Sequence, residues 1–397
     1  MTLGKQTKLF SAFEPATQEA WRKQILHDLK AATLEEKQAL YEQKMIWKPE
    51  PEITTAPFYT REDIQTIPLP VVPASQVGWL TEEFIPFLTE KSSNQLGREA
   101  LQQGADALCF DLSAVNLATV NLPVLLQGIK LSDAPVRFIV NKSPGSFLQQ
   151  LQIIAPYQWK GGLHYDPLMQ QSASVSDIDS LAEVFRQTND FPEFYPLTVN
   201  SNPGNSTTRE IAYLLSAFVE YAHQLTERGV QAAAIFNKTI FSVSVGTNFF
   251  MEMAKLMALR LLYTQLAAAY QVTNHKLFIH TPIEFSHTPA EDPYNNLIRS
   301  SLAAMSAVLG GCQSLRVLPF NGKTDDVISR RISRNVSIIL KEESYFAQVA
   351  DIAGGSYYVE NLTHMIATEA WRLFTEIEAE GGFLQARQSG FLILPSQ

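Results

Sequence analysis

Three of the seven histidines, His275, His280 and His287, lie close together in the sequence and are the first candidates for metal binding or acid–base chemistry. Their spacing forms neither HxH nor HExxH, the patterns that bring two imidazoles onto one zinc ion. His280 ends a predicted strand, the position from which barrel enzymes present catalytic side chains. A single histidine there is more often a structural or loop residue, so no metal site is predicted.

Residues 201–210, SNPGNSTTRE, are the best candidate for binding a phosphate or another anion. The segment follows a predicted strand and precedes a helix, so Gly204, Asn205 and Ser206 would lie at a helix N-terminus. Neither the dinucleotide-binding pattern GxGxxG nor the P-loop pattern GxxxxGK[ST] occurs. A loop that only caps the helix is the simpler interpretation.

Nucleophiles and paired carboxylates are the remaining source of chemistry. The sequence contains no GxSxG elbow to expose a serine between a strand and a helix. Asp111, Asp166 and Glu284 lie near the ends of predicted strands, but nothing in their spacing pairs them. The residues alone therefore indicate no catalytic constellation.

Seven short apolar runs alternate with helical patterns from about residue 95 onward. They are too apolar to be strands with one exposed face, as expected where both faces of a sheet are covered. The alternation predicts an α/β fold, a (β/α)8 TIM barrel, with a doubly wound open sheet as the alternative. The seven runs cover residues 107–112, 136–141, 160–166, 194–200, 239–246, 276–281 and 314–320.

Residues 1–65 differ from the remainder and are predicted to form an N-terminal arm for subunit association, with the barrel over residues 66–397. Apolar residues recur at helical spacing after Trp21, and Thr17 is a plausible N-cap. Prolines then prevent the helical pattern from continuing. A surface helix that packs on its own domain is an equally good interpretation of this segment.

Residues 292–311, DPYNNLIRSSLAAMSAVLGG, have the features of a complete helix. Asp292 suits the N-cap and Pro293 the first helical position, and Gly310 and Gly311 suit the exit. The buried face is predicted to consist of Leu297, Ile298, Leu302, Met305 and Leu309. We interpret this helix as part of the frame of the barrel and not as part of a site.

The overall composition excludes several classes of protein. A net charge of −9 without a basic stripe argues against nucleic-acid and anionic-membrane surfaces. The two cysteines, Cys109 and Cys312, lie far apart, which fits a reducing compartment. No stretch resembles a signal peptide or a membrane span, so a cytoplasmic protein is expected.

Several segments together resemble the barrel of coenzyme B12-dependent methylmalonyl-CoA mutase. Residues 292–315, DPYNNLIRSSLAAMSAVLGGCQSL, are similar to the family pattern DPYNNxxRTxxEAMxAVxGGTxSL. Three further motifs of the family are matched, in the same order along the chain, by VGTNFFMEMAKLMALRLLY before this segment and by RISRNVSIILKEES and ADIAGGSYYVENLT after it. LFSAFEPATQEAWRKQILHDLK and GGLHYDPL resemble segments of the family's smaller chain.

The resemblance implies a radical isomerase that binds acyl-CoA along the axis of a TIM barrel. In this family a separate C-terminal domain holds adenosylcobalamin, through the histidine of a DxHxxG motif. Bacterial forms can be heterodimers of a catalytic large chain and a non-catalytic small chain. No DxHxxG occurs in the 397 residues, so a cobalamin-binding domain is expected to be absent.

Several positions depart from the pattern of the catalytic chain. LTVNSNPGNSTTRE lacks the histidine of the matching catalytic segment, and GGLHYDPLMQQS lacks its glutamine. In FIHTPIEF, His280 matches the family, but Phe278 replaces an arginine and Pro282 a glutamine. Met257 stands where the family usually has another arginine. These losses remove donors that would hold an acyl thioester.

The prediction is therefore a non-catalytic small subunit with no catalytic, cofactor-binding or metal residues of its own. Its partner would be the large mutase chain, which would hold both adenosylcobalamin and acyl-CoA, with no nucleic acid or membrane involved. The alternative is an active acyl-CoA mutase barrel whose cobalamin domain is on another chain. Any ligand retained by this barrel would be expected at Asn205, Asn248, His280 and Glu284.

Overall fold

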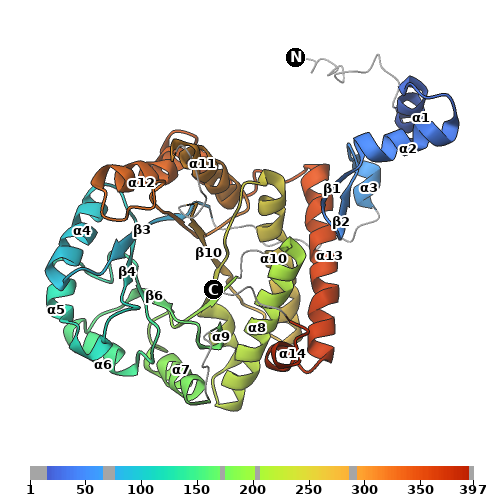
Figure 1. The fold of residues 1–397 in the computed structure, drawn as a ribbon. Helices are drawn as coiled ribbons and strands as arrows, with labels where there is room; N and C mark the ends of the chain where they lie inside the picture. Colours follow the sequence, from blue (N-terminus) through green and yellow to red (C-terminus); the bar gives the residue numbers. More distant parts are fainter. Residues whose placement is uncertain (1–15, 66–76, 170–174, 202–205, 286–292, 393–397) are drawn as a thin grey trace, which may run out of the picture. The chain divides into compact units, whose positions relative to one another are not determined.

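A computed structural model describes residues 16–65, 77–169, 175–201, 206–285 and 293–392. The chain divides into two compact units, Met1–Pro68 and Leu69–Gln397, and each is described by itself (Figure 1). Across the described ranges, no helix has the length and apolarity needed to cross a bilayer.

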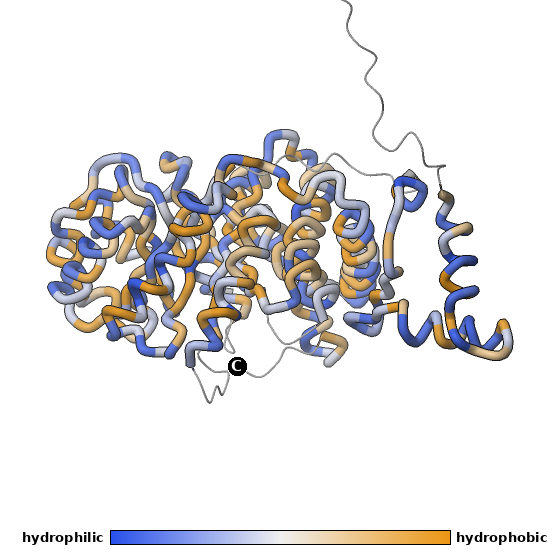
Figure 2. Tube along the Cα trace, turned by 90° about the horizontal axis from the view of Figure 1, so that it is seen from above, coloured by the Kyte–Doolittle hydropathy of each residue, from blue (hydrophilic) through white to orange (hydrophobic). Residues whose placement is uncertain are grey.

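The first unit consists of two capped helices, a short antiparallel hairpin and one further helical turn. Thr17 accepts a hydrogen bond from the backbone N–H of Ala20, as predicted, and Thr33 with Glu36 forms a capping box. Few of its side chains are fully buried, and Figure 2 colours its two longer helices mostly hydrophilic. The elements are α1 (Gln18–Asp28), α2 (Leu34–Met45), β1 (Trp47–Glu50), β2 (Ile53–Thr55) and α3 (Arg61–Gln65).

The second unit is built on one parallel sheet with the strand order β7-β6-β5-β4-β3-β11-β10-β9-β8. Strands β7 and β8 are two parts of a single crossing, interrupted at Pro196. The hydroxyl of Thr198 on β8 donates a hydrogen bond to the carbonyl oxygen of Leu163 on β6 and so joins these two strands. The sheet is therefore a ring of eight crossings, which confirms the predicted TIM barrel. The strands are β3 (Leu80–Pro86), β4 (Ala107–Asp111), β5 (Val136–Ile139), β6 (Lys160–His164), β7 (Glu193–Tyr195), β8 (Leu197–Asn200), β9 (Thr239–Ser242), β10 (Phe278–Ile283) and β11 (Ser314–Val317).

The strand that sequence reasoning missed is β3, the first of the barrel. Its central residues Glu82 and Glu83 are both buried, one on each face of the strand. Two adjacent acidic residues do not fit the sequence pattern of a strand that is covered on both faces, because buried charges require partners from other elements. Those partners come from distant parts of the chain.

Helices surround the ring of strands (Figure 1). The long helices α8 and α10 lie between successive strands, in agreement with the predicted alternation, and α13 packs on both of them. Short helical turns fill the connections. The helices are α4 (Glu90–Gln102), α5 (Leu122–Leu125), α6 (Gly145–Ile154), α7 (Val175–Gln187), α8 (Thr207–Glu227), α9 (Ala232–Asn237), α10 (Phe249–Ala269), α11 (Tyr294–Leu309), α12 (Val327–Glu342), α13 (Tyr357–Ala379) and α14 (Phe383–Ser389), with η1 (Leu117–Thr119), η2 (Pro167–Met169) and η3 (Phe346–Gln348).

The predicted helix at residues 292–311 is confirmed as α11, but its predicted buried face is wrong. Ile298 is 70% exposed and Leu302 is also exposed. Small and polar side chains such as Ser300 and Ala304 are buried instead, which allows close approach to the neighbouring elements. Asp292 lies outside the described residues, and Pro293 occupies the N-cap position.

Two consecutive glycines follow Lys160 in β6, where the neighbouring strands leave no room for a side chain. Gly161 has φ = +115°, and a Cβ atom there would overlap the carbonyl oxygen of Val136 on β5. We expect Gly161→Ala to lower the free energy of unfolding by about 2–3 kcal/mol, through backbone strain and displacement of β5. Urea denaturation measures this, with Gly145→Ala as the control, since nothing lies within 4 Å of a Cβ atom there. Equal stabilities of the two variants would contradict the expectation.

Candidate functional site in the barrel

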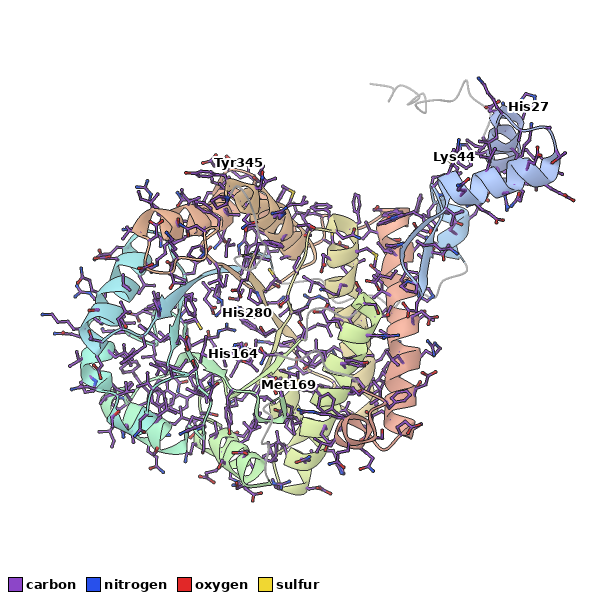
Figure 3. The ribbon with its side chains drawn as sticks, in the orientation of Figure 1. His27, Lys44, His164, Met169, His280 and Tyr345 are labelled. Carbon is purple, nitrogen blue, oxygen red and sulfur yellow. The ribbon has the colours of Figure 1, made fainter. Side chains whose placement is uncertain are left out.

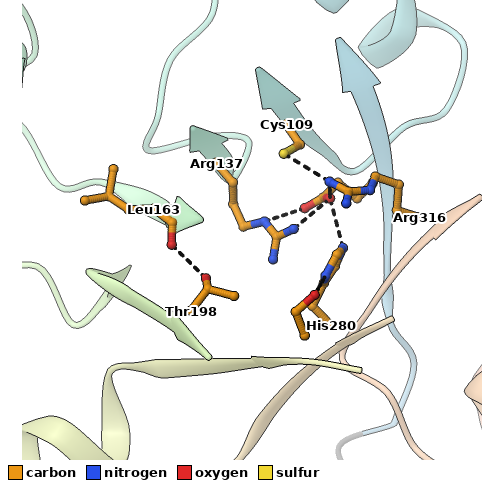
Figure 4. A network of polar contacts seen from close by, with 8 residues as sticks. Cys109, Arg137, Leu163, Thr198, His280 and Arg316 are labelled. Carbon is orange, nitrogen blue, oxygen red and sulfur yellow. Dashed lines mark hydrogen bonds and ion pairs between the residues drawn. The ribbon is translucent and has the colours of Figure 1, made fainter. Parts of the chain in front are cut away.

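A buried ionic cluster lies inside the ring of strands, around the carboxylate of Glu82 on β3 (Figure 4). Arg137 on β5 binds it with two nitrogens, Nη2 at 3.0 Å from Oε1 and Nε at 2.8 Å from Oε2. Arg316 on β11 places Nη1 3.3 Å from Oε1, and His280 on β10 places Nε2 3.1 Å from the same oxygen. Side chains from two early strands, β3 and β5, and from the last two strands, β10 and β11, thus meet at the carboxylate of Glu82. We refer to these four residues as the Glu82 cluster.

The charges within the Glu82 cluster follow from its burial and its contacts. Burial alone would raise the pKa of Glu82, but Arg137, His280 and Arg316 outweigh it and hold the pKa well below its usual range. Burial, reinforced by Arg137, lowers the pKa of His280 to about 3 against the opposing effect of Glu82. At neutral pH the cluster therefore contains one carboxylate, two guanidinium groups and a neutral imidazole.

The neutral His280 has a defined hydrogen-bonding role. Because an ionised carboxylate can only accept, Nε2 of His280 is assigned the proton that it donates to Glu82. Its Nδ1 then accepts from the hydroxyl of Ser242, 3.1 Å away on β9. The side chain is fully buried and both of its nitrogens are engaged. In this state His280 acts as a structural link between strands.

Cys109 and His164 are also unsuited to acid–base chemistry near neutral pH. Cys109 on β4 receives a hydrogen bond from Arg316, and burial raises the pKa of its thiol to about 11, which leaves the thiol protonated. His164 on β6 has a pKa well below its usual value, first because of burial and then because of the two arginines. Figure 3 shows His164 and His280 in the interior of the barrel.

Asp166, which follows β6, is held in a separate contact with the helix layer. Its carboxylate accepts from the hydroxyl of Tyr221 on α8 at 2.6 Å and from the backbone N–H of Asn200 at 2.8 Å. Burial raises its pKa to about 6, although both hydrogen bonds oppose the shift. The same tyrosine oxygen accepts from the N–H of Leu168, so this group fixes the loop after β6 to α8.

On the opposite face of β3, Glu83 forms a matching ionic contact with α12. Arg330 donates from Nε and Nη2 to Oε1, at 3.1 and 2.9 Å, and Nη1 of Arg334 lies 3.1 Å from Oε2. These side chains fasten the helix to the strand from outside the barrel. The two adjacent carboxylates of β3 therefore bind different partners on the two faces.

The four residues predicted for a retained ligand have different environments. His280 belongs to the Glu82 cluster, whereas Asn248, at the N-cap of α10, and Glu284, just after β10, are exposed. Asn205 lies outside the described residues. Ser206, from the same predicted loop, is the N-cap of α8 and accepts from the N–H of Arg209, in agreement with the simpler interpretation of that loop.

Sequence reasoning missed three members of the Glu82 cluster, Glu82, Arg137 and Arg316. The available signal was an arginine within each of two apolar runs, VRFIVN and SLRVLPF. An arginine in a strand covered on both faces must meet a buried acceptor. The sequence did not indicate which acceptor, because β3 itself was missed.

Two cavities of the barrel unit are small in comparison with a ligand site. One of about 10 Å³ lies beside Trp79 and Cys312, and another of about 10 Å³ beside Phe84 and Arg330. Pockets for small molecules and cofactors usually measure roughly 300–1,000 Å³. A larger hollow of about 630 Å³ belongs to the first unit and is lined by residues that include Trp21, Tyr41, Ile46 and Phe58.

Comparison with known sequences identifies the family of this barrel. A family profile described as methylmalonyl-CoA mutase matches residues 115–394. The chain belongs to the methylmalonyl-CoA mutase family. The family motifs that frame α10, α11, α12 and α13 are thus retained around a lumen that contains the Glu82 cluster.

Relatives within the mutase family include both kinds of subunit. The methylmalonyl-CoA mutase small subunit of Porphyromonas gingivalis is 31% identical, over 97% of this chain and 66% of that protein. The large subunit of the same organism is 27% identical, over 87% of this chain and 56% of its own length. The chain therefore spans less than two thirds of either relative. Among solved structures, a dihydropteroate synthase from Xanthomonas albilineans has a TM-score of 0.40 at 13% identity, covering 69% of this chain and 95% of that one.

Proposed function

We propose that this chain is a non-catalytic small subunit of a heterodimeric, adenosylcobalamin-dependent methylmalonyl-CoA mutase. The observation that carries the proposal is the Glu82 cluster, because charged side chains of the protein itself meet inside the barrel. Glu82 and Arg137 have side chains that are 1% and 4% exposed. In a catalytic barrel of this family, the resemblance predicts acyl-CoA along the same axis.

The energetics of the cluster oppose entry of a thioester. An acyl-CoA lying on the axis would have to displace Arg137 or Arg316 from Glu82, which would leave a buried carboxylate with fewer partners. Separating a buried ion pair typically costs about 3–5 kcal/mol. The replacements at Phe278 and Pro282 also remove donors, and loss of one such donor typically costs a factor of about 10²–10³ in rate.

His280, the histidine that matches the family, does not suit a cobalt ligand for adenosylcobalamin. A cobalt ligand requires an imidazole nitrogen that is free to coordinate, and both nitrogens of His280 are engaged by Glu82 and Ser242. We therefore assign the cofactor to the partner chain. The role of this chain would then be to stabilise the folded large subunit by association.

Two features support a large mutase subunit as the partner. One organism provides separate small and large subunit relatives of this chain. The first unit has several aromatic side chains that are only half-buried, including Trp21 and Phe58, which lie 4.1 Å apart between ring centroids at one side of its hollow. We propose that this unit contacts the large subunit.

Coexpression with the large subunit encoded by the same genome tests the proposal. We expect the two chains to copurify and to show mutase activity, and the isolated chain to bind no acyl-CoA in calorimetric titration. Trp21→Ala should weaken copurification by roughly tenfold or more, as for other aromatic interface residues. Lys23→Ala is the matched control, since Lys23 lies on the same helix and forms only an exposed ion pair with Glu19.

A different outcome would favour the alternative of an active barrel with its cobalamin domain on another chain. That alternative expects the isolated chain to bind a CoA ester and to convert it when a cobalamin-binding module is supplied. Asn205, Asn248, His280 and Glu284 would then be its ligand contacts. Saturable binding of acyl-CoA that is lost in Asn248→Ala would overturn the non-catalytic assignment.

A further inference from the structure

Three buried nitrogens inside the barrel have neither a hydrogen-bond partner nor an ion-pair contact among the described residues. They are Nη1 of Arg137, Nε of Arg316 and Nδ1 of His164. The two arginine side chains are only 4% and 8% exposed, so bulk water does not surround them. A buried donor without a partner is costly, and in native proteins it often marks a bound water or ion.

The charge balance inside the barrel points to an anion. Arg137 and Arg316 carry two positive charges, and Glu82 supplies one negative charge between them. Burial lowers the pKa values of His164 and His280, so both imidazoles are neutral near pH 7. The Glu82 cluster therefore retains one positive charge that its own carboxylate does not compensate, which a low-dielectric interior disfavours.

The geometry of Arg137 leaves one side of its guanidinium available. Nε and Nη2 face Glu82, so Nη1 is directed away from the carboxylate (Figure 4). Both arginines affect the pKa of His164, as expected for charges that face the same interior. We assign the proton of the neutral His164 ring to Nδ1, which makes this nitrogen a donor. Two guanidinium groups and an imidazole N–H are donors that proteins use to bind carboxylates and oxyanions.

We propose that the barrel lumen binds one small anion, a short carboxylate or an inorganic oxyanion, between Arg137, Arg316 and His164. The anion satisfies the unpaired donors and neutralises the excess charge. This site is independent of the proposed subunit role, because it needs neither acyl-CoA nor a partner chain. It also differs from the predicted ligand contacts, since His280 remains bound to Glu82 and Ser242.

Isothermal titration of the full chain in chloride-free HEPES buffer at constant ionic strength tests the site. The titrants are acetate, phosphate and chloride, which separate a carboxylate, an inorganic oxyanion and a halide. We expect saturable 1:1 binding of acetate or phosphate that is tighter than binding of chloride. Arg137→Gln and His164→Phe should each weaken this binding about tenfold to a hundredfold, the usual effect of losing a hydrogen bond to a charged group. Melting temperatures recorded with the same anions give a second readout.

Arg330→Gln is the matched control, because Arg330 binds Glu83 outside the barrel and its loss should leave anion binding unchanged. If Arg137→Gln does not fold, His164→Phe decides the outcome alone, since His164 takes no part in the Glu82 contacts described above. Absence of saturable binding by all three anions at about 10 mM, where a millimolar site would be occupied, would overturn the proposal. Equal binding by wild type and His164→Phe would overturn it as well.

Discussion

Glu82→Gln is expected to lower the free energy of unfolding by about 3–5 kcal/mol, the usual result of removing one partner from a buried ionic group. The amide keeps the size of the side chain but leaves the charges of Arg137 and Arg316 without a carboxylate. Nε2 of His280 also loses an ionised acceptor. Urea denaturation followed by circular dichroism at pH 7 measures the change.

Glu369→Gln provides the comparison for this experiment. Glu369 accepts from Arg372 one turn along α13, and the arginine side chain is 54% exposed, so loss of the pair should change stability by less than about 0.5 kcal/mol. If the two variants lose equal stability, the Glu82 cluster is not the buried ionic contact described above, and the main support for a non-catalytic barrel is removed.

Acidification is expected to destabilise the wild type more than His280→Gln. The folded pKa of His280, about 3, lies below the ordinary histidine value of about 6.5, so the unfolded chain binds this proton more readily. The associated stability is present above pH 6.5 and is lost as the pH falls from 6.5 towards 3. Between pH 7 and 5 the loss from His280 alone is about 2 kcal/mol, from 1.36 kcal/mol per pH step below 6.5.

Comparison of the two proteins isolates His280 from other groups. His164 also has a lowered pKa and contributes in the same direction, but it does so in both proteins. Glutamine has no charge to gain and can still donate to Glu82 and accept from Ser242. The difference in free energy of unfolding between the wild type and His280→Gln should therefore change progressively when it is measured at pH 7, 6 and 5. Parallel profiles would mean that His280 is already accessible to protons in the folded state.

The sequence predicted the barrel well because most of its strands are short apolar runs between strongly patterned helices. It failed at β3, where the acidic pair is stable only through partners more than 50 residues away. It also failed for the buried face of α11, since close helix packing selects small residues and leaves Ile298 and Leu302 exposed. Both errors arise where tertiary contacts override a local pattern.

The candidate site was predictable only in part. Family resemblance singled out His280, and the structure buries that residue inside the barrel. Its role could not be inferred, because the residues that determine it come from β3, β9 and the two strands that carry arginines. The identity of a side chain fixes its possible chemistry, whereas burial and neighbours decide which protonation state is present.

The acidic pair of β3 has a consequence for how the ring is closed. The first and last barrel strands share only two register pairs, Ser314 with Leu80 and Leu315 with Thr81. This short seam is one place where the cylinder could open, and there Glu82 contacts β11 from inside the barrel while Glu83 contacts the following helix from outside. The two carboxylates stabilise the contact between the first and last strands on both faces of the sheet. Separation of these strands must therefore break ionic contacts on both faces at once.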